Sequence, residues 1–190
     1  MPFKIQSTHL NGIVVLKTEA FEDARGYFLE VFREDTFKAL GLPYYFPQDN
    51  QSRSVKGVIR GLHFQWDPPM GKLMRVIYGT AFLVAVDIRK GSPTLGKWFG
   101  IEASAENKLQ VWAPAGFARG FCVLSDVAEV QYKCTGIYNS KCESNIIWND
   151  PTIGIEWPIS KPILSERDSK AQTLKEWLSS PNSNYFKYQI

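Results

Sequence analysis

Polar side chains recur along the segment from Lys56 to Gln65, which otherwise has the apolar content of a β-strand. His63 and Gln65 are two residues apart, so in a strand both side chains lie on the same face. An imidazole directed into the interior of a barrel can take up and release protons near neutral pH, which is the chemistry of an acid–base enzyme. A single histidine hydrogen-bonded within the core is the simpler interpretation of these residues taken alone.

Other polar residues could bind a ligand. The run from Gln48 to Ser52 offers amide and carboxylate groups that can contact hydroxyls or the edge of a base, although a solvated loop also explains such a run. Arg25 could bind a phosphate through two parallel hydrogen bonds, or form an ion pair in an exposed turn. Lys72 opens an apolar run shortly after two prolines, at a position where most lysines are simply solvated.

The chain has two histidines, His9 and His63, among its 190 residues. Zinc, copper and iron sites commonly use two or three histidines, so we expect no metal site. Cys122, Cys134 and Cys142 are odd in number and include no Cys-x-x-Cys pair, which argues against both a disulfide framework and a four-thiolate zinc site. We therefore expect the three cysteines to be reduced thiols.

Composition and charge restrict the partners and the compartment. With 44% hydrophobic and 22% charged residues the chain can bury a core, and its length predicts a single domain over residues 1–190. Lys and Arg number 22 against 19 Asp and Glu, without a long basic run, so neither nucleic acid nor an anionic membrane is an expected partner. The first residues lack the apolar core of a signal peptide, and no apolar run reaches the roughly 20 residues of a membrane span, which favours the cytoplasm.

The elements that must position these residues are mostly strands. Short runs rich in Val, Ile, Phe, Tyr and Trp alternate with Gly and Pro, and they predict strands at 12–18, 27–32, 58–65, 72–78, 80–89, 98–103, 109–113, 120–124, 128–135 and 146–148. The nearly all-apolar run 81–86 predicts a strand covered on both faces. Two helices are predicted, at 33–40 and 168–179, the second capped by Asp168 or Ser169. This pattern favours an all-β, antiparallel jelly-roll barrel with a few short helices.

Several short motifs follow one another along most of the chain, and together they are specific. They are Arg60-Gly61-Leu62-His63-Phe64-Gln65, Gly71-Lys72-Leu73, the stretch from Val86 to Thr94, Pro114-Ala115-Gly116-Phe117-Ala118, Trp148-Asn149-Asp150-Pro151 and Ile155-Glu156-Trp157-Pro158. In these motifs, over roughly residues 21–168, the chain closely resembles the dTDP-4-dehydrorhamnose 3,5-epimerase family. The resemblance implies a jelly-roll fold of the cupin type, a homodimer, and no metal or organic cofactor.

The substrate implied by the resemblance is a dTDP-linked 4-keto-6-deoxy-hexose, as used in L-rhamnose and other deoxysugar biosynthesis. Its C4 carbonyl acidifies the protons on C3 and C5, so loss of either proton gives an enolate, and reprotonation from the opposite face inverts that carbon. Such a reaction needs a base on one face, an acid on the other, and a cation or donor at the enolate oxygen.

The resemblance implies four catalytic positions. His63 matches the base, and Asp168 matches the carboxylate that orients its imidazole. Tyr132 matches the proton donor, and we expect a neighbouring cation to lower the pKa of its phenol and ease proton release. Lys72 matches the residue that stabilises the enolate oxygen.

Further positions match family residues that contact the nucleotide, the diphosphate or the sugar. Tyr138 matches an aromatic residue that stacks on the thymine ring. Arg167 stands where relatives usually have Lys, which keeps the charge but replaces a point donor by a planar fork. The remaining matched positions are Arg25, Glu30, Gln48, Asp49, Asn50, Arg60 and Glu143.

The chain departs from the family pattern at two positions. Arg119 stands where family members usually have His, and Leu83 where they usually have Asp. One hypothesis is that Arg119 points into the substrate pocket and places a fixed positive charge near the carbonyl oxygen or the diphosphate. In the alternative, these two residues repack a support position and the chain is an ordinary double epimerase.

Other functions stay open on the sequence. The chain could invert only C3 or only C5, act on another nucleotide sugar, move the carbonyl from C4 to C3 as a ketoisomerase, or bind a sugar nucleotide without catalysis. For the expected homodimer, the segment Lys4–Lys17 is a candidate strand for exchange with a partner.

Overall fold

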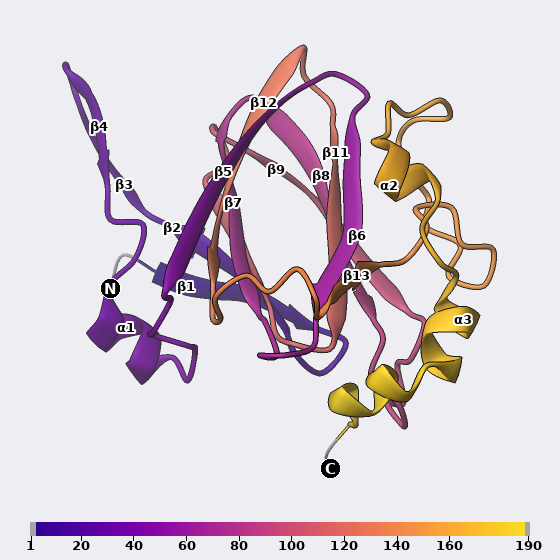
Figure 1. The fold of residues 1–190 in the computed structure, drawn as a ribbon. Coiled ribbons are helices and arrows are strands. Elements are labelled where there is room, and N and C mark those ends of the chain that lie inside the picture. The colour runs from indigo at the N-terminus through magenta and orange to yellow at the C-terminus, as the bar shows by residue number, and fades with distance from the viewer. Residues whose placement is uncertain (1–2, 189–190) are drawn as a thin grey trace.

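Strands are the main regular elements of the molecule, which a computed structural model describes over residues 3–188 (Figure 1). The six-stranded sheet has the order β1 (Phe3–His9), β2 (Ile13–Thr18), β10 (Leu109–Ala113), β7 (Lys72–Tyr78), β12 (Val127–Cys134) and β5 (Gln48–Val55). The five-stranded sheet has the order β13 (Glu143–Asn145), β6 (Ile59–Gln65), β11 (Phe117–Val123), β8 (Thr80–Asp87) and β9 (Trp98–Ser104). Neighbouring strands are antiparallel, and the two sheets form the predicted jelly roll. Within residues 3–188 no helix is both long enough and apolar enough to span a membrane.

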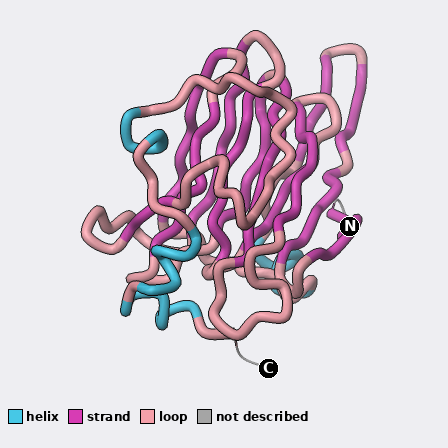
Figure 2. The backbone as a smooth tube through the Cα atoms, turned by 90° about the vertical axis from the view of Figure 1, so that its right-hand side faces the viewer, coloured by secondary structure: helices cyan, strands magenta, loops and turns pink. Residues whose placement is uncertain are grey.

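The main hydrophobic core lies between the two sheets, because each sheet turns an apolar face inward. Val15 and Val130 come from the six-stranded sheet, and Phe121 comes from the five-stranded sheet. β8 is buried on both faces, as its almost wholly apolar sequence predicts. Its outward face places Val84 in a second cluster with Trp177 of the C-terminal segment, which lies across the five-stranded sheet (Figure 2).

Most predicted strands are confirmed, and β7 and β10 match their predicted bounds. The strand predicted at 146–148 is wrong, because residues 143–145 pair with β6 whereas Ile146 makes only a single bridge to Gln172. The sequence did not predict β5, since the run from Gln48 to Val55 has few apolar residues, yet it pairs along its whole length with β12. The main errors therefore lie at short or polar strands.

The N-terminal segment forms a hairpin whose second strand, β2, matches the strand predicted at 12–18, so the segment Lys4–Lys17 suggested for exchange with a partner is not one continuous strand. Leu10 and Asn11 have φ angles of 49° and 51°, in the left-handed region that a regular strand does not contain. The chain therefore reverses at this point, and β1 pairs with β2 of the same chain.

The helix predicted at 33–40 is confirmed as α1 (Glu34–Ala39), but the helix predicted at 168–179 is wrong. That region forms two helices, α2 (Glu166–Ser169) and α3 (Leu174–Ser179), followed by a 3-10 helix (Pro181–Phe186). The caps are Ser165 and Thr173, whose side chains accept hydrogen bonds from the backbone N–H groups three residues on, so neither Asp168 nor Ser169 is a cap. Two start signals in one short segment divide the helix.

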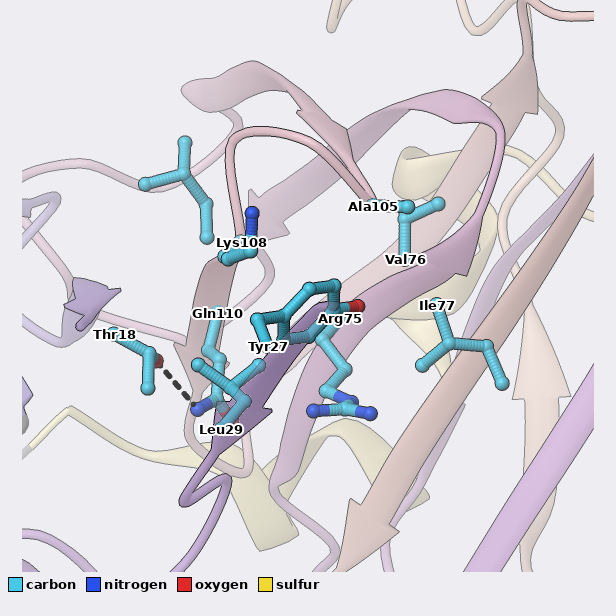
Figure 3. A pocket seen from close by; sticks show the side chains of 10 residues that line it. Thr18, Tyr27, Leu29, Arg75, Val76, Ile77, Ala105, Lys108 and Gln110 are labelled. Atoms are coloured by element: carbon cyan, nitrogen blue, oxygen red, sulfur yellow. Dashed lines mark hydrogen bonds between the residues drawn. The ribbon is translucent and has the colours of Figure 1, made fainter. Parts of the chain in front are cut away.

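A separate hairpin, β3 (Ala20–Asp23) and β4 (Gly26–Leu29), projects from the body of the molecule (Figure 1). Where it meets the six-stranded sheet, Tyr27 lies beside a small hollow with Arg75 and Lys108 (Figure 3). The Nζ of Lys108 lies 4.8 Å from the centroid of the Tyr27 ring. The hollow has a volume of about 30 Å³, which holds roughly one or two waters, so it cannot hold a sugar nucleotide.

Asp87 at the end of β8 is a buried carboxylate that holds together the loop after the strand. It accepts bonds from Nε and Nη2 of Arg89 at 2.9 and 2.8 Å, and from the hydroxyls of Ser92 and Thr94 at 2.5 and 2.6 Å. We expect Asp87→Ala to lower the free energy of unfolding by about 3–5 kcal/mol, because it leaves the Arg89 charge uncompensated. Urea unfolding measures this loss, and exposed Asp126→Ala serves as the control; a loss for Asp87→Ala no larger than for the control contradicts the prediction.

The same carboxylate makes the stability of the fold sensitive to acid. Burial raises the pKa of Asp87, but its bonds from Arg89, Ser92 and Thr94 outweigh burial and hold the pKa below its ordinary value. The stabilisation is therefore present above the pKa of the unfolded chain, about 3.9, and is lost as the pH falls through the lower pKa of the folded state.

Candidate active site

A cavity opens between the two sheets, with His63 of β6, Lys72 of β7 and Tyr132 of β12 on its walls. One part, which we call the Arg119 side, is also lined by Ser52, Arg60, Met74, Arg119, Gly120 and Phe121. The other part, the Tyr138 side, is also lined by Gln48, Asn50, Phe64, Gln65, Met70, Cys134, Tyr138, Glu143 and Arg167. Most of the predicted site residues are therefore brought together. Across the described chain, no three His, Cys, Asp or Glu side chains are close enough together to hold a metal ion.

β6 carries Arg60 and His63 into the same cavity although they are three residues apart. In a regular strand such residues face opposite sides. Here the pairing shifts, because Arg119 lies opposite His63 whereas Phe121 lies opposite Arg60, so β6 contains one extra residue. Gly61 lies at this irregularity with a φ of 131°, and a Cβ atom there would be 2.6 Å from the backbone of β11. Only glycine fits, and the shift turns both polar side chains toward the cavity.

His63 is held by Asp168, which lies in α2 and 105 residues away in the sequence. Nε2 of His63 is 2.7 Å from Oδ1 of Asp168, which also accepts a bond from Nδ2 of Asn145 at 3.0 Å. Burial raises the pKa of Asp168, but the hydrogen bond and charge of His63, with bonds from Ser165 and Asn145, outweigh burial and lower it. The carboxylate is therefore ionised at neutral pH and fixes the imidazole, whose Nδ1 has no hydrogen-bond partner among residues 3–188.

Lys72 and Tyr132 lie together on adjacent strands, with Nζ of Lys72 4.7 Å from the centroid of the Tyr132 ring. Burial, reinforced by the charge of Arg119, lowers the pKa of Lys72 to about 8. Burial raises the pKa of the Tyr132 phenol, and this exceeds the lowering caused by Arg60 and Arg119. Neighbouring cations do lower this pKa, as predicted, but the predicted net lowering is wrong, because desolvation of the phenolate is the larger effect and the pKa is raised.

Three side chains on the Tyr138 side form one hydrogen-bonded group. Oε1 of Glu143 accepts a bond from the Tyr138 hydroxyl at 2.9 Å and forms an ion pair with Nη1 of Arg167. Burial raises the pKa of Glu143, but the bonds from Arg167 and Tyr138 outweigh it and lower that pKa. Tyr138 is 52% exposed, so its ring is open to stacking by a planar group.

Asp49 does not line the cavity, contrary to its prediction as a substrate contact. It alternates along β5 with Gln48 and Asn50, which do line the cavity, so its side chain faces the opposite side of the sheet. There its Oδ2 accepts a bond from Nζ of Lys133 at 2.7 Å.

Arg25 and Glu30 also lie outside the cavity, on and next to the β3–β4 hairpin. Arg25 is paired with Asp23 at the tip, and its side chain is 90% exposed, as the simpler interpretation of an exposed ion pair predicted. Glu30 follows β4, and its Oε1 is buried without a hydrogen-bond partner among the described residues. Within one chain, the structure therefore separates these two residues from His63.

The sequence did not single out several residues of the site. Asn145 bonds to Asp168 because β13 pairs with β6, and nothing local in the sequence signals that pairing. Cys134 lines the cavity because it alternates with Tyr132 along β12. Ser165 does have a signal, since Ser165-x-x-Asp168 is the usual pattern of a helix N-cap, and it could have placed the start of α2.

Comparison with known protein families and curated relatives agrees with this geometry. The family model described as dTDP-4-dehydrorhamnose 3,5-epimerase matches residues 7–176. The dTDP-4-dehydrorhamnose 3,5-epimerase of Shigella flexneri is 50% identical over 167 residues, which cover 87% of this chain and 92% of that protein. The enzyme of the same name from Neisseria gonorrhoeae is 52% identical over 170 residues, but the match covers 89% of this chain and only 52% of that relative.

A solved structure is similar over the whole length of both chains. It is a dTDP-6-deoxy-D-glucose-3,5-epimerase from Legionella pneumophila Philadelphia 1 in complex with dTDP-4-keto-L-rhamnose. The two chains are 42% identical and align with a TM-score of 0.93 over 99% of this chain and 100% of the other. This chain belongs to the dTDP-4-dehydrorhamnose 3,5-epimerase family.

Proposed function

We propose that this chain epimerises a dTDP-linked 4-keto-6-deoxy-hexose at C3 and C5. One observation carries the proposal: His63 stands on the five-stranded sheet and Tyr132 on the six-stranded sheet, at opposite walls of one cavity. A sugar ring between them meets a base on one face and a proton donor on the other. That arrangement is what inversion of a carbon next to a ketone needs.

In the proposed step, His63 takes the proton from C5 or C3, and the electron pair of the broken C–H bond forms the carbon–carbon double bond of the enolate. The negative charge moves to the C4 oxygen, which the Lys72 ammonium group stabilises. Tyr132 then gives its proton to the opposite face of the same carbon, so the centre is inverted. Asp168 holds the imidazole and stabilises its protonated form, as its 2.7 Å bond to His63 supports.

The Tyr138 side of the cavity would hold the nucleotide. The exposed ring of Tyr138 can stack on thymine, and the ion pair of Glu143 and Arg167 on the same side of the cavity would contact the sugar and diphosphate. Gln48 and Asn50 present amides to the same space, and Arg60 presents a guanidinium on the Arg119 side. We assign these six residues to substrate binding.

Incubation of the protein with dTDP-4-keto-6-deoxyglucose in deuterated water tests the proposal. Deuterium at both C3 and C5 of an inverted product supports a double epimerase, whereas bound substrate without any exchange supports a non-catalytic binder. A 3-keto product seen by NMR indicates a ketoisomerase. Either of the last two results overturns the proposal.

A single-centre epimerase is the second candidate, and Arg119 with Leu83 is the observation that favours it. Leu83 is part of the inner hydrophobic core, so the chain has no carboxylate at this position to pair with Arg119. A changed environment on the Arg119 side could leave one of the two carbons out of reach of the base. Deuterium at only one carbon in the experiment above identifies this activity.

We also propose that the chain works as a homodimer in which the β3–β4 hairpin reaches a second copy. Phe21, Tyr27 and Phe28 of the hairpin are 57%, 56% and 67% exposed, a large apolar surface for a soluble protein. Arg25 and Glu30 match substrate contacts of the family but lie outside the cavity of their own chain, so a hairpin seated on another copy could deliver them there.

Light scattering after size-exclusion chromatography tests the dimer. We expect the wild-type mass to be twice that of the chain, and Phe28→Asp to shift it toward the monomer, because a charge would replace an apolar contact. Tyr45→Asp, at a residue that is 72% exposed and lies outside the hairpin, is the matched control and should leave the mass unchanged. A monomeric wild-type protein at working concentration contradicts the proposal.

We propose the cytoplasm as the compartment. Cys122, Cys134 and Cys142 are free thiols in the structure, the first two of them buried. Burial also raises the pKa of the Cys122 thiol to about 11, which keeps it protonated and unreactive. Free thiols of this kind are typical of proteins in a reducing compartment.

A further inference from the structure

Arg119 is a buried cation that forms no ion pair among residues 3–188. It is 3% exposed, and its Nη1 donates to three backbone carbonyls, those of Met70 at 2.8 Å and of Ala113 and Pro114 at 3.2 Å each. Its Nε and Nη2 are buried without a hydrogen-bond partner in the described part of the chain. A buried guanidinium without a partner carboxylate lowers the stability of the fold, so we expect Arg119 to serve a function.

The three carbonyls all lie next to the backbone that carries Lys72. Met70 is two residues before Lys72, and Ala113 is directly opposite Lys72 in the pairing of β10 with β7. Arg119 on β11 therefore ties together the start of β7 and the end of β10 from across the cavity. Any shift of these segments would move the Lys72 ammonium group relative to the Tyr132 ring.

The charge of Arg119 also acts on Lys72. Burial lowers the pKa of Arg119 to about 10, which is still above the value of about 8 to which burial and Arg119 together lower the pKa of Lys72. Arg119 therefore keeps its charge over the pH range in which Lys72 loses its proton. The other groups that act on Lys72 are Cys134 and Glu143, and both raise its pKa.

We propose that Arg119 is a positioning residue for Lys72. Arg119 holds the start of β7 through its bonds to backbone carbonyls, and it presents an uncompensated positive charge to the Lys72 ammonium group. This inference rests on the proposed function for its catalytic consequence only. In that function, loss of the Lys72 proton removes the cation beside the enolate oxygen, so Arg119 sets the upper pH limit of the reaction. Arg119 lines the cavity, but its Nε and Nη2 are buried and its Nη1 donates to backbone carbonyls. We therefore replace the hypothesis that its charge contacts the substrate with an action through Lys72.

Two variants separate the charge of Arg119 from its backbone bonds. Arg119→Met removes both. Leu83→Asp keeps the backbone bonds of Arg119 but adds a carboxylate near its guanidinium, which offsets the charge. Leu83 is diagonally opposite Arg119, since it is two residues along β8 from Ala85, which lies directly opposite Arg119. That diagonal separation of about 7–8 Å is within reach of long side chains. Arg53→Met, at a side chain that is 62% exposed and lies outside the cavity, is the control.

The first measurement is a titration of Lys72 by NMR in protein labelled at lysine Cε, with its signal assigned by its loss in Lys72→Met. We expect a wild-type midpoint near pH 8 and an upward shift of at least half a pH unit in both Arg119→Met and Leu83→Asp, with no shift in Arg53→Met. An unchanged midpoint in folded Leu83→Asp overturns the inference, even where Arg119→Met fails to fold. Because this titration needs no turnover, it decides the inference whether or not the chain proves to be an epimerase.

The second measurement is the pH profile of kcat for epimerisation. We expect Arg119→Met to lower kcat roughly tenfold at pH 7.5, with KM changed less than threefold. It should also move the alkaline limb of the kcat profile to higher pH. Arg119→Lys should keep part of the wild-type kcat. Leu83→Asp should move the same limb while keeping kcat within about threefold. Wild-type kcat and an unmoved limb in both variants overturn the inference.

Discussion

Replacement of His63 by alanine is expected to lower kcat for epimerisation by about 10²–10⁴-fold, the usual contribution of a general base. The reason is that His63 is the proposed proton acceptor on its wall of the cavity, where Asp168 holds it at 2.7 Å. His63 is proposed to act on the sugar ring and not to hold the nucleotide, so the dissociation constant for dTDP should stay within about threefold of the wild-type value. Stopped assays by NMR measure the loss in rate, and isothermal titration calorimetry measures the binding.

The chain supplies its own matched control for this experiment. His9, the second of the two histidines, lies on β1, where it bonds to Ser7 and stacks on Phe99 with ring centroids 3.9 Å apart. His9→Ala should therefore retain wild-type kcat. If His63→Ala keeps more than a tenth of the wild-type rate, His63 is not the base and the proposed function fails at its central residue.

Replacement of Tyr132 by phenylalanine is expected to separate proton exchange from inversion. Without the phenol, kcat for the inverted product should fall by about 10²–10⁴-fold, because the proposed proton donor on the six-stranded sheet side of the sugar is lost. His63 can still remove the proton and return one to the same face. Its side chain is 29% exposed, so we expect its proton to exchange with solvent between these two steps.

The measurement is therefore deuterium in substrate that has not been inverted. In Tyr132→Phe, deuterium should enter C3 or C5 of recovered substrate faster than product forms. Tyr78→Phe, at a tyrosine that is 57% exposed on β7, should behave as wild type. Loss of exchange in parallel with loss of inversion would show that Tyr132 acts before proton removal, contrary to its role as donor on the opposite face.

The sequence was most informative where the position of a residue along one strand determines which way its side chain points. His63 and Gln65 share a face because they are two residues apart, and both line the cavity. Lys72 is the first residue of β7, as predicted. Such local patterns depend only on the alternation of side chains along a strand.

The sequence was least informative where segments distant in the chain meet. Neither the bond between His63 and Asp168 nor the contact of Asn145 with that carboxylate follows from spacing, and only the family resemblance indicated the first. Arg60 enters the cavity through a register shift that no count of residues reveals. The pKa of Tyr132 was misjudged for a related reason, since its burial depends on the packing of the whole barrel.

The placement of His63 and Tyr132 on different sheets has a consequence for how new specificities could arise in this barrel. In the proposed function each sheet presents one chemical partner to a sugar that lies between them, so the arrangement of the two sheets sets the configuration of the product. Substitutions along the rim can then exchange one hexose for another without re-engineering stereochemistry. Conversely, a core substitution that widens the gap between the two sheets should increase the fraction of product with the wrong configuration before it weakens nucleotide binding. The spacing of the two sheets would then itself determine the stereochemical outcome of the reaction.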